Sequence, residues 1–328
     1  MRASDAVVAG PTRERQRRSL WKRFRRATRE PRNALLARGI ANVARAIGVL
    51  PAPAGLALGR ALGRGAHALL GTPRRLARTH IAVAFPELDE AARARLVRTT
   101  FEHAGQSFAE LGLWRKLGRQ PGYIEIENLA ALDDALAGGR GALAITGHVG
   151  NWELLAATVA ARGYGLSVVA RRVHDERFNS LITRFRGDRG MEVLLRDAPD
   201  FLAQVRDALG RNRIVALLMD QDSRGAGVFV PFFGRPARTP PGAAVLALRA
   251  RVPVVTVFIE RRTGGGRLVR VASVASDVHR GRDGVRELTA RLTAAIEAQI
   301  RRCPAEWVWW HERWRKRLPA TARVRAPS

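Results

Sequence analysis

From Tyr123 onwards, short runs of apolar and β-branched residues alternate with stretches of helical periodicity, and this alternation restricts the fold more than any other feature. The runs predict strands at Ala142–Thr146, Leu166–Ala170, Glu192–Leu195, Ile214–Met219, Val254–Ile259 and Leu268–Val274. The helices predicted between and after them are Glu153–Arg162, Arg177–Asp188, Pro199–Leu209, Pro241–Arg249 and Asp283–Arg302. Strands that alternate with helices form βαβ units, whose crossover helices make neighbouring strands parallel. The sequence therefore predicts an α/β fold with a mainly parallel central sheet flanked by helices.

The chain before this alternation has a different pattern, which predicts a helical N-terminal region. Residues 33–71 mix aliphatic side chains with spaced arginines, and Pro51 and Pro53 are expected to divide them into short helices. Glu87–Lys116 has apolar residues at helical spacings, which predicts one long amphipathic helix or two short ones. We expect four parts: a basic, disordered arm (1–32), a helical interfacial region (33–120), an α/β catalytic domain (121–318) and a tail (319–328).

The net charge of +28 narrows the possible partners, while the 46% of hydrophobic residues exclude disorder for most of the chain. The first 32 residues hold eleven basic and three acidic side chains, so this arm is either a solvated tail or an anchor for anionic lipid or nucleic acid. Charge alone supports a nucleic-acid-binding protein as the competing class. Against that class, no known binding motif is present, and arginine is spread over every segment. We expect anionic membrane lipid as a partner and no nucleic acid.

Cysteine usage and hydropathy indicate the cellular compartment. Cys303 is the single cysteine of the chain, so neither an intramolecular disulfide nor a cysteine-based zinc site can form, which fits a reducing compartment. The longest run without Asp, Glu, Lys or Arg, Ala46–Gly59, has 14 residues. A membrane-spanning helix needs about 20 predominantly apolar residues. We therefore expect peripheral or interfacial membrane attachment, with neither a spanning helix nor a cleaved signal peptide.

The segment from Gly141 to Leu155 is the best candidate for chemistry, because it reads as a strand, a tight turn and a helix. His148 lies just past the strand, and ligand sites in open parallel sheets lie off the carboxyl ends of strands. Asn151 is a plausible N-cap, and the helix start at Gly150 and Asn151 could offer backbone N–H groups to a phosphate or oxyanion. The turn lets Glu153 converge on His148, where a carboxylate would fix the imidazole tautomer and make His148 a general base. The alternative is a capping Glu153 beside an incidental turn histidine.

Four parts of the chain, at residues 147–153, 171, 220–242 and 307–314, together resemble those of bacterial lipid A late acyltransferases, the lauroyl/myristoyl transferase family. The block from Gly147 to Glu153 resembles the family's His-x4-acidic motif, and Arg171 matches an arginine that follows the next strand. Asp220-Gln221-Asp222, followed by Val228 to Gly234, Thr239 and Gly242, is similar to the second large block. The run Trp307-Val308-Trp309-Trp310-His311-Glu312-Arg313-Trp314 matches the C-terminal signature. The resemblance covers residues 33 to 318.

This resemblance implies a glycerolipid-acyltransferase-like fold and a transfer reaction without metal, cofactor or covalent acyl-enzyme. The acyl group would pass from acyl carrier protein, or less often acyl-CoA, to a hydroxyl of a lipid A precursor at the cytoplasmic face of the inner membrane. In that scheme His148 deprotonates the acceptor hydroxyl with help from Glu153, and Arg171 holds an acidic headgroup or stabilises developing negative charge. A lysophospholipid or other glycolipid acyltransferase is an alternative that the sequence leaves open.

The remaining motif residues are expected to bind substrate or to support the fold. Asp220, Gln221 and Asp222 follow an apolar strand, where they could position the acceptor or pair with Arg238, although two solvated loop acids are an equal alternative. Of the C-terminal tryptophans, alternate ones are expected in the core. His311 and Arg313 are expected near the site, with no catalytic role assigned to His311.

Overall fold

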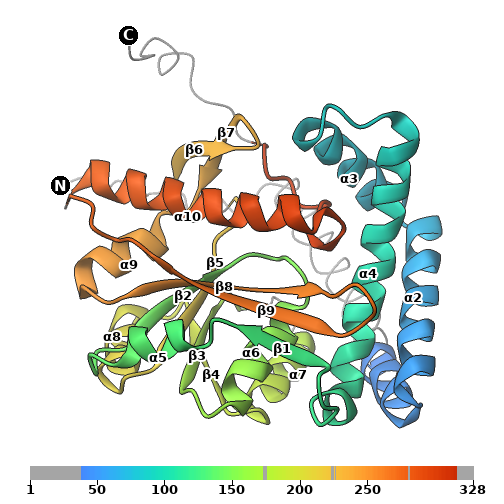
Figure 1. Cartoon of the computed structure of the whole chain (residues 1–328), viewed down its shortest axis with the longest axis horizontal. Helices are drawn as coiled ribbons and strands as arrows, with labels where there is room; N and C mark the ends of the chain where they lie inside the picture. The colour runs from blue at the N-terminus through green and yellow to red at the C-terminus, as the bar shows by residue number, and fades with distance from the viewer. Residues whose placement is uncertain (1–37, 173–175, 223–224, 226, 280, 316–328) are drawn as a thin grey trace, which may run out of the picture.

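The computed structural model describes residues 38–172, 176–222, 225, 227–279 and 281–315, so the basic arm 1–32 and the tail 319–328 lie outside the described residues. In this part the chain forms an α/β body with a helical N-terminal region beside it (Figure 1). The predicted fold class is thereby confirmed. No helix of the described part is both long and apolar enough to cross a membrane.

The central sheet has seven strands in the order β1-β9-β8-β2-β5-β3-β4. Its strands are β1 (Ile124–Glu127), β2 (Ala142–Thr146), β3 (Leu166–Ala170), β4 (Met191–Leu195), β5 (Ile214–Leu218), β8 (Val254–Arg261) and β9 (Arg267–Val274). All neighbours pair in parallel except β8 and β9, which form an antiparallel hairpin. A separate antiparallel hairpin consists of β6 (Val228–Phe232) and β7 (Arg235–Thr239). The sequence pattern did not predict β1, which has only four residues, or β6, which Pro231 interrupts.

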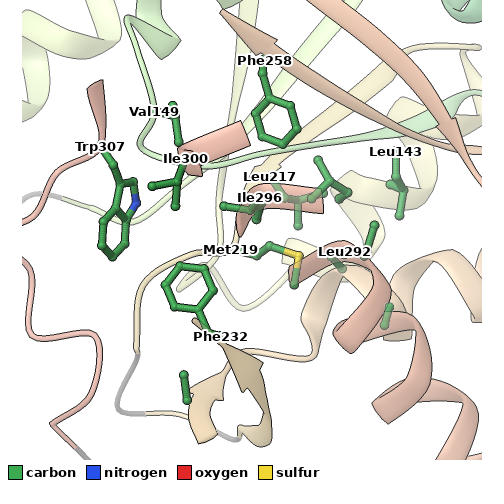
Figure 2. Packing of buried hydrophobic residues seen from close by; sticks show 14 of the residues in the cluster. Leu143, Val149, Leu217, Met219, Phe232, Phe258, Leu292, Ile296, Ile300 and Trp307 are labelled. Carbon is green, nitrogen blue, oxygen red and sulfur yellow. The ribbon is translucent and has the colours of Figure 1, made fainter. Parts of the chain in front are cut away.

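Helices cover both faces of the sheet, and alternate residues of the buried strands belong to opposite layers. Leu143 and Ile145 of β2 pack in a cluster with α8 (Phe201–Gly210), α9 (Gly242–Ala250) and α10 (Arg282–Arg302), whereas Ala142 and Ala144 pack against the other layer. That other layer holds α5 (Ala130–Leu136), α6 (Trp152–Ala161) and α7 (Glu176–Gly187). Figure 2 shows the first cluster, where Met219 after β5, Phe232 of β6 and Ile296 of α10 come together.

The N-terminal helices pack closely because glycines line their contact. After helical residues 38–49 come α2 (Ala52–Leu69), α3 (Gly71–Ala84) and α4 (Glu90–Leu117), and α2 runs beside α4 (Figure 1). A Cβ on Gly63 would lie 2.2 Å from the Phe101 carbonyl oxygen, and one on Gly105 would lie 2.2 Å from that of Gly59. The expected division is confirmed at Pro51, which separates residues 38–49 from α2. Pro53 does not break a helix: it lies in the first turn of α2, where a backbone N–H would have no intrahelical partner.

Candidate active site

The candidate active site forms where the carboxyl ends of β2 and β5 meet. The two strands pair in register from Ala142 opposite Ile214 to Thr146 opposite Leu218. Continued by two residues, this register places His148 opposite Asp220. The carboxylate of Asp220 lies 2.8 Å from Nδ1 of His148 and accepts the His148 backbone N–H at 2.9 Å.

Asp220 is a buried anion whose bonds fix the orientation of the histidine. Its Oδ2 also accepts the indole N–H of Trp307 at 2.7 Å, and the side chain is completely buried. Burial opposes ionisation, but the nearby His148 imidazole and three hydrogen bonds, from the imidazole, the Trp307 indole and the His148 backbone N–H, hold the pKa of Asp220 well below its usual range. An ionised carboxylate only accepts hydrogen bonds, so Nδ1 of His148 must carry the proton. The other ring nitrogen, Nε2, is then the basic one in neutral imidazole.

His148 lines a cavity of about 600 Å³ in which several of the predicted site residues come together. Arg171, Gln221 and Asp222 line the same cavity, as does His311 from the C-terminal motif. Its lining combines these polar and charged groups with apolar side chains, among them Val193, Leu195, Phe201, Leu202, Val245 and Leu246. The cavity is therefore amphipathic, and the histidine is one of its polar groups.

The predicted contact between His148 and Glu153 is wrong. Both oxygens of Glu153 accept a fork of hydrogen bonds from Arg186 of α7, at 2.6 and 3.0 Å. Glu153 lies in the first turn of α6, on the layer that contains α7, whereas Asp220 follows the strand next to β2. The carboxylate that orients the imidazole therefore comes from the neighbouring strand, not from the following helix. Asp220, expected to position the acceptor, faces His148 instead.

Gly150 and Asn151 lie beside this site, but their polar groups are engaged by the protein. The N–H of Gly150 donates to the Glu306 carbonyl at 2.9 Å, so it cannot serve a phosphate or oxyanion as expected. Gly150 has a φ of +65°, and a Cβ there would lie 2.0 Å from the Ile259 carbonyl oxygen. Asn151 caps α6 as predicted, accepting the Leu154 N–H, and its amide donates to Glu110 and to the Ser107 carbonyl. Both residues hold the turn in place.

The second motif block and the C-terminal motif both contribute residues to the lining of the cavity, and they contact each other. Asp222 pairs with Arg238 at 2.8 Å, as expected, and has Arg315 at 3.6 Å. Arg313 is buried and donates to the Arg238 carbonyl and to the hydroxyl of Thr239. Trp307 and Trp309 are buried in the core, in agreement with the alternation predicted for the tryptophans.

A buried ionic network, which the sequence analysis missed, supports the turn that carries His148. Arg267 at the start of β9 is fully buried and pairs with Glu110 of α4 and with Glu306, each at 2.6 Å. Glu110 also bonds Asn151, and Glu306 bonds Gly150 through its carbonyl. Since breaking one partner of a buried ion pair leaves an uncompensated charge, this network ties α4 and β9 to the turn that carries His148. No signal along the chain distinguishes Arg267 from the other arginines.

The lowered pKa of His103, in α4, predicts that the free energy of unfolding depends on pH. Burial, with the nearby Arg261, Arg267 and Arg60, lowers the pKa of His103 from 6.5 to about 3. The folded protein therefore binds this proton less readily than the unfolded chain. The contribution of His103 to the free energy of unfolding is complete above about pH 6.5. It decreases as the pH falls below that value, by up to about 1.4 kcal/mol per pH unit. We expect urea midpoints between pH 6.5 and 5 to fall less steeply in His103→Gln. An equally steep fall in the variant would contradict this role of His103.

Comparisons with known proteins agree with one another on the kind of enzyme. The model of the family described as bacterial lipid A biosynthesis acyltransferase matches residues 21–316. A phosphatidylinositol mannoside acyltransferase of Mycobacterium tuberculosis is 30% identical over 219 residues, which are 65% of this chain and 67% of that protein. A lipid A biosynthesis lauroyltransferase of Escherichia coli is 26% identical over 281 residues, 82% of this chain and 87% of that protein. A palmitoleoyltransferase of lipid A biosynthesis from the same species is 25% identical over 279 residues, with the same coverage.

Proposed function

Because the chain belongs to the bacterial lipid A biosynthesis acyltransferase family, we propose that it moves a fatty acyl group from a thioester to a hydroxyl of a lipid A precursor, with His148 as the general base. The observation that carries this proposal is the hydrogen bond between the buried Asp220 and His148, which lines an amphipathic cavity. An imidazole oriented by a carboxylate is suited to removing a hydroxyl proton.

The proposed reaction uses the two nitrogens of His148 in different ways. Nε2 removes the proton of the acceptor hydroxyl while the oxygen attacks the thioester carbonyl carbon. Asp220, bonded to Nδ1, stabilises the imidazolium that forms. When the tetrahedral intermediate collapses, the carbon–sulfur bond breaks, and the imidazolium returns its proton to the leaving thiolate. The products are an ester and a free thiol, and His148 is neutral again.

The cavity offers apolar side chains to the acyl chain and polar side chains to the headgroup. We place the chain against the apolar side chains of Leu195, Phe201 and Leu246, since burial of each methylene contributes about 0.8 kcal/mol. Arg171 is exposed at the end of β3 and lines the same cavity, which suits it to an acidic headgroup or the oxyanion. Gln221 and Asp222 can bond sugar hydroxyls.

In this proposal Glu153 acts through Arg186 rather than through His148. Arg186 of α7 lines the cavity, and its guanidinium group is held by the Glu153 carboxylate. The ion pair is mostly shielded from solvent, with 15% and 18% of the two side chains exposed. Glu153 thus positions a cavity-wall arginine, and its removal is expected to affect substrate binding more than proton transfer.

We infer the acyl donor and the membrane location from the net charge and from exposed aliphatic side chains. Acyl carrier protein is acidic, so the net charge of +28 suits it as the donor and also suits anionic lipid. Aliphatic side chains such as Val49 and Leu69, 79% and 84% exposed, lie on the N-terminal helices. We place the enzyme peripherally on the cytoplasmic face of the inner membrane, attached through these helices.

A phosphatidylinositol mannoside is the second candidate acceptor, because relatives at 30% and 31% identity are named acyltransferases for that lipid. Both acceptors present sugar hydroxyls on an anionic lipid, so the same base and cavity serve either. The lipid A precursor remains the first candidate, since the relatives named for lipid A are matched over a larger share of this chain.

A direct assay tests the proposal and separates the acceptors. Purified protein is incubated with acyl carrier protein thioesters or acyl-CoA and with a lipid A precursor, a phosphatidylinositol mannoside or a lysophospholipid, and products are identified by mass spectrometry. We expect one acyl group added to the lipid A precursor, with the carrier protein as the better donor. Product only from the mannoside would replace the acceptor, and product from none of them would refute the proposed reaction.

A further inference from the structure

A second cavity, of about 650 Å³, lies between α2, α4 and the loop that joins β8 to β9. Four arginines line it: Arg60 and Arg64 of α2, and Arg261 and Arg262 at the end of β8. No Asp or Glu is among its lining residues. It shares no lining residue with the cavity at His148, so it is a separate feature of the surface.

The arginines around this cavity outnumber the carboxylates that could neutralise them. Arg64 and Arg98 share Glu102, and Arg262 pairs with Glu125. Arg261 and Arg267 share Glu110, and Arg267 also pairs with Glu306. Within the described residues Arg60 has no ion pair. The cavity therefore has an excess of positive charge that its own surroundings do not compensate, and an anion entering it would be attracted.

Neutral groups complete the wall without reducing this charge. His103 lines the cavity, its Nδ1 is buried without a hydrogen-bond partner in the described structure, and the low pKa described above keeps it neutral. On the other side, Gly264, Gly265 and Gly266 have φ values of +91°, +108° and +79°. Glycine adopts this conformation without strain and leaves only backbone at the rim, which allows close approach of a ligand.

We propose that this cavity binds the phosphate group of a phosphate ester. Guanidinium groups match phosphate oxygens in geometry as well as charge, since each can donate two parallel hydrogen bonds. Arg60 and Arg64 lie one turn apart on α2 and face the end of β8, so donors from two elements can reach the same anion.

The geometry of α2 favours a phosphate carried by a soluble molecule over one in a lipid headgroup. Leu58 and Leu62 are exposed on this helix, and each precedes an arginine of the cavity by two residues. At about 100° per residue, two positions correspond to about 200°, so the leucines lie on the opposite flank of α2 from the arginines. A membrane that covered the leucines would leave the arginine flank facing away from it.

Binding of 4′-phosphopantetheine to the full chain, measured by isothermal titration calorimetry, tests the proposal. Arg60→Ala/Arg64→Ala is expected to weaken binding about tenfold or more, because two charged donors are lost. The matched control is Arg75→Ala/Arg78→Ala on α3, which removes the same charge, including one arginine with a surface carboxylate partner, and should leave binding unchanged. Thermal unfolding of both pairs checks that the fold is retained.

A second arm distinguishes the source of the phosphate. Binding to vesicles of phosphatidylcholine with phosphatidylglycerol is measured by flotation for the unmodified protein and for the same two double variants. Loss specific to Arg60→Ala/Arg64→Ala in the vesicle arm alone would assign the cavity to a lipid headgroup. Equal effects of both pairs in both arms, or no binding of either probe, would overturn the proposal. His148→Ala should bind both probes as the unmodified protein does, so this result is independent of the proposed reaction.

Discussion

His148→Ala is expected to abolish acyl transfer almost completely, with kcat reduced roughly 10²- to 10⁴-fold, the range typical of a lost general base. The side chain is the base of the proposed reaction and lines the cavity with 24% of its surface exposed. Without it, the acceptor hydroxyl must lose its proton to water during attack on the thioester. Steady-state kinetics with the acceptor identified by mass spectrometry measure this effect.

Free imidazole distinguishes a lost base from a damaged fold. Alanine leaves a space beside Trp152, whose ring packs edge-on against His148 at 4.9 Å between centroids. We expect added imidazole to restore part of the activity of His148→Ala and to leave the unmodified protein unaffected. Full activity of the variant without imidazole would exclude His148 as the base.

Asp220→Asn is expected to have the second largest effect, a fall in kcat of roughly 10²-fold or more with KM little changed. An asparagine of the same shape can still accept or donate hydrogen bonds, but it no longer carries the charge that stabilises the imidazolium. It also no longer requires the proton to sit on Nδ1, so the wrong tautomer becomes accessible. Because Asp220 is buried and does not touch the substrate in this proposal, binding should be preserved.

Glu153→Gln is the matched comparison for Asp220→Asn, since it removes one carboxylate charge of the same region. The structure pairs Glu153 with Arg186, so its loss should raise KM and lower kcat by much less than Asp220→Asn does. If instead Glu153→Gln lost kcat and Asp220→Asn did not, Glu153 would be the partner of the base, and the assignment of Asp220 would be wrong. Circular dichroism of both variants checks for unfolding.

Local sequence was sufficient wherever a structural feature depends on residues near one another in the chain. β2 and β3 have the predicted bounds, Asn151 caps α6, and His148 stands at the end of a buried strand. Periodicity and capping act over a few residues, which is why they can be read without knowledge of the fold. The short β1 and the hairpin of β6 and β7 were not predicted from the sequence, because their hydrophobic patterns are weak or interrupted.

The partner of His148 could not be predicted in the same way. From the chain alone Glu153, five positions away, was the nearest carboxylate, whereas Asp220 lies 72 positions away and was assigned to the acceptor. The same holds for Arg267, whose pairing with Glu110 and Glu306 joins three distant segments. Nothing in the neighbouring sequence distinguishes Arg267 among the 54 arginines of the chain.

The sequence by itself determined the fold class, the strand–turn–helix unit that carries the histidine, and the resemblance that points to acyl transfer. Only the tertiary structure decided which carboxylate orients the imidazole and which arginines lie around a cavity. The physical reason is that strand order and register depend on how whole layers pack against each other, and these arrange β5 beside β2 so that Asp220 lies opposite His148.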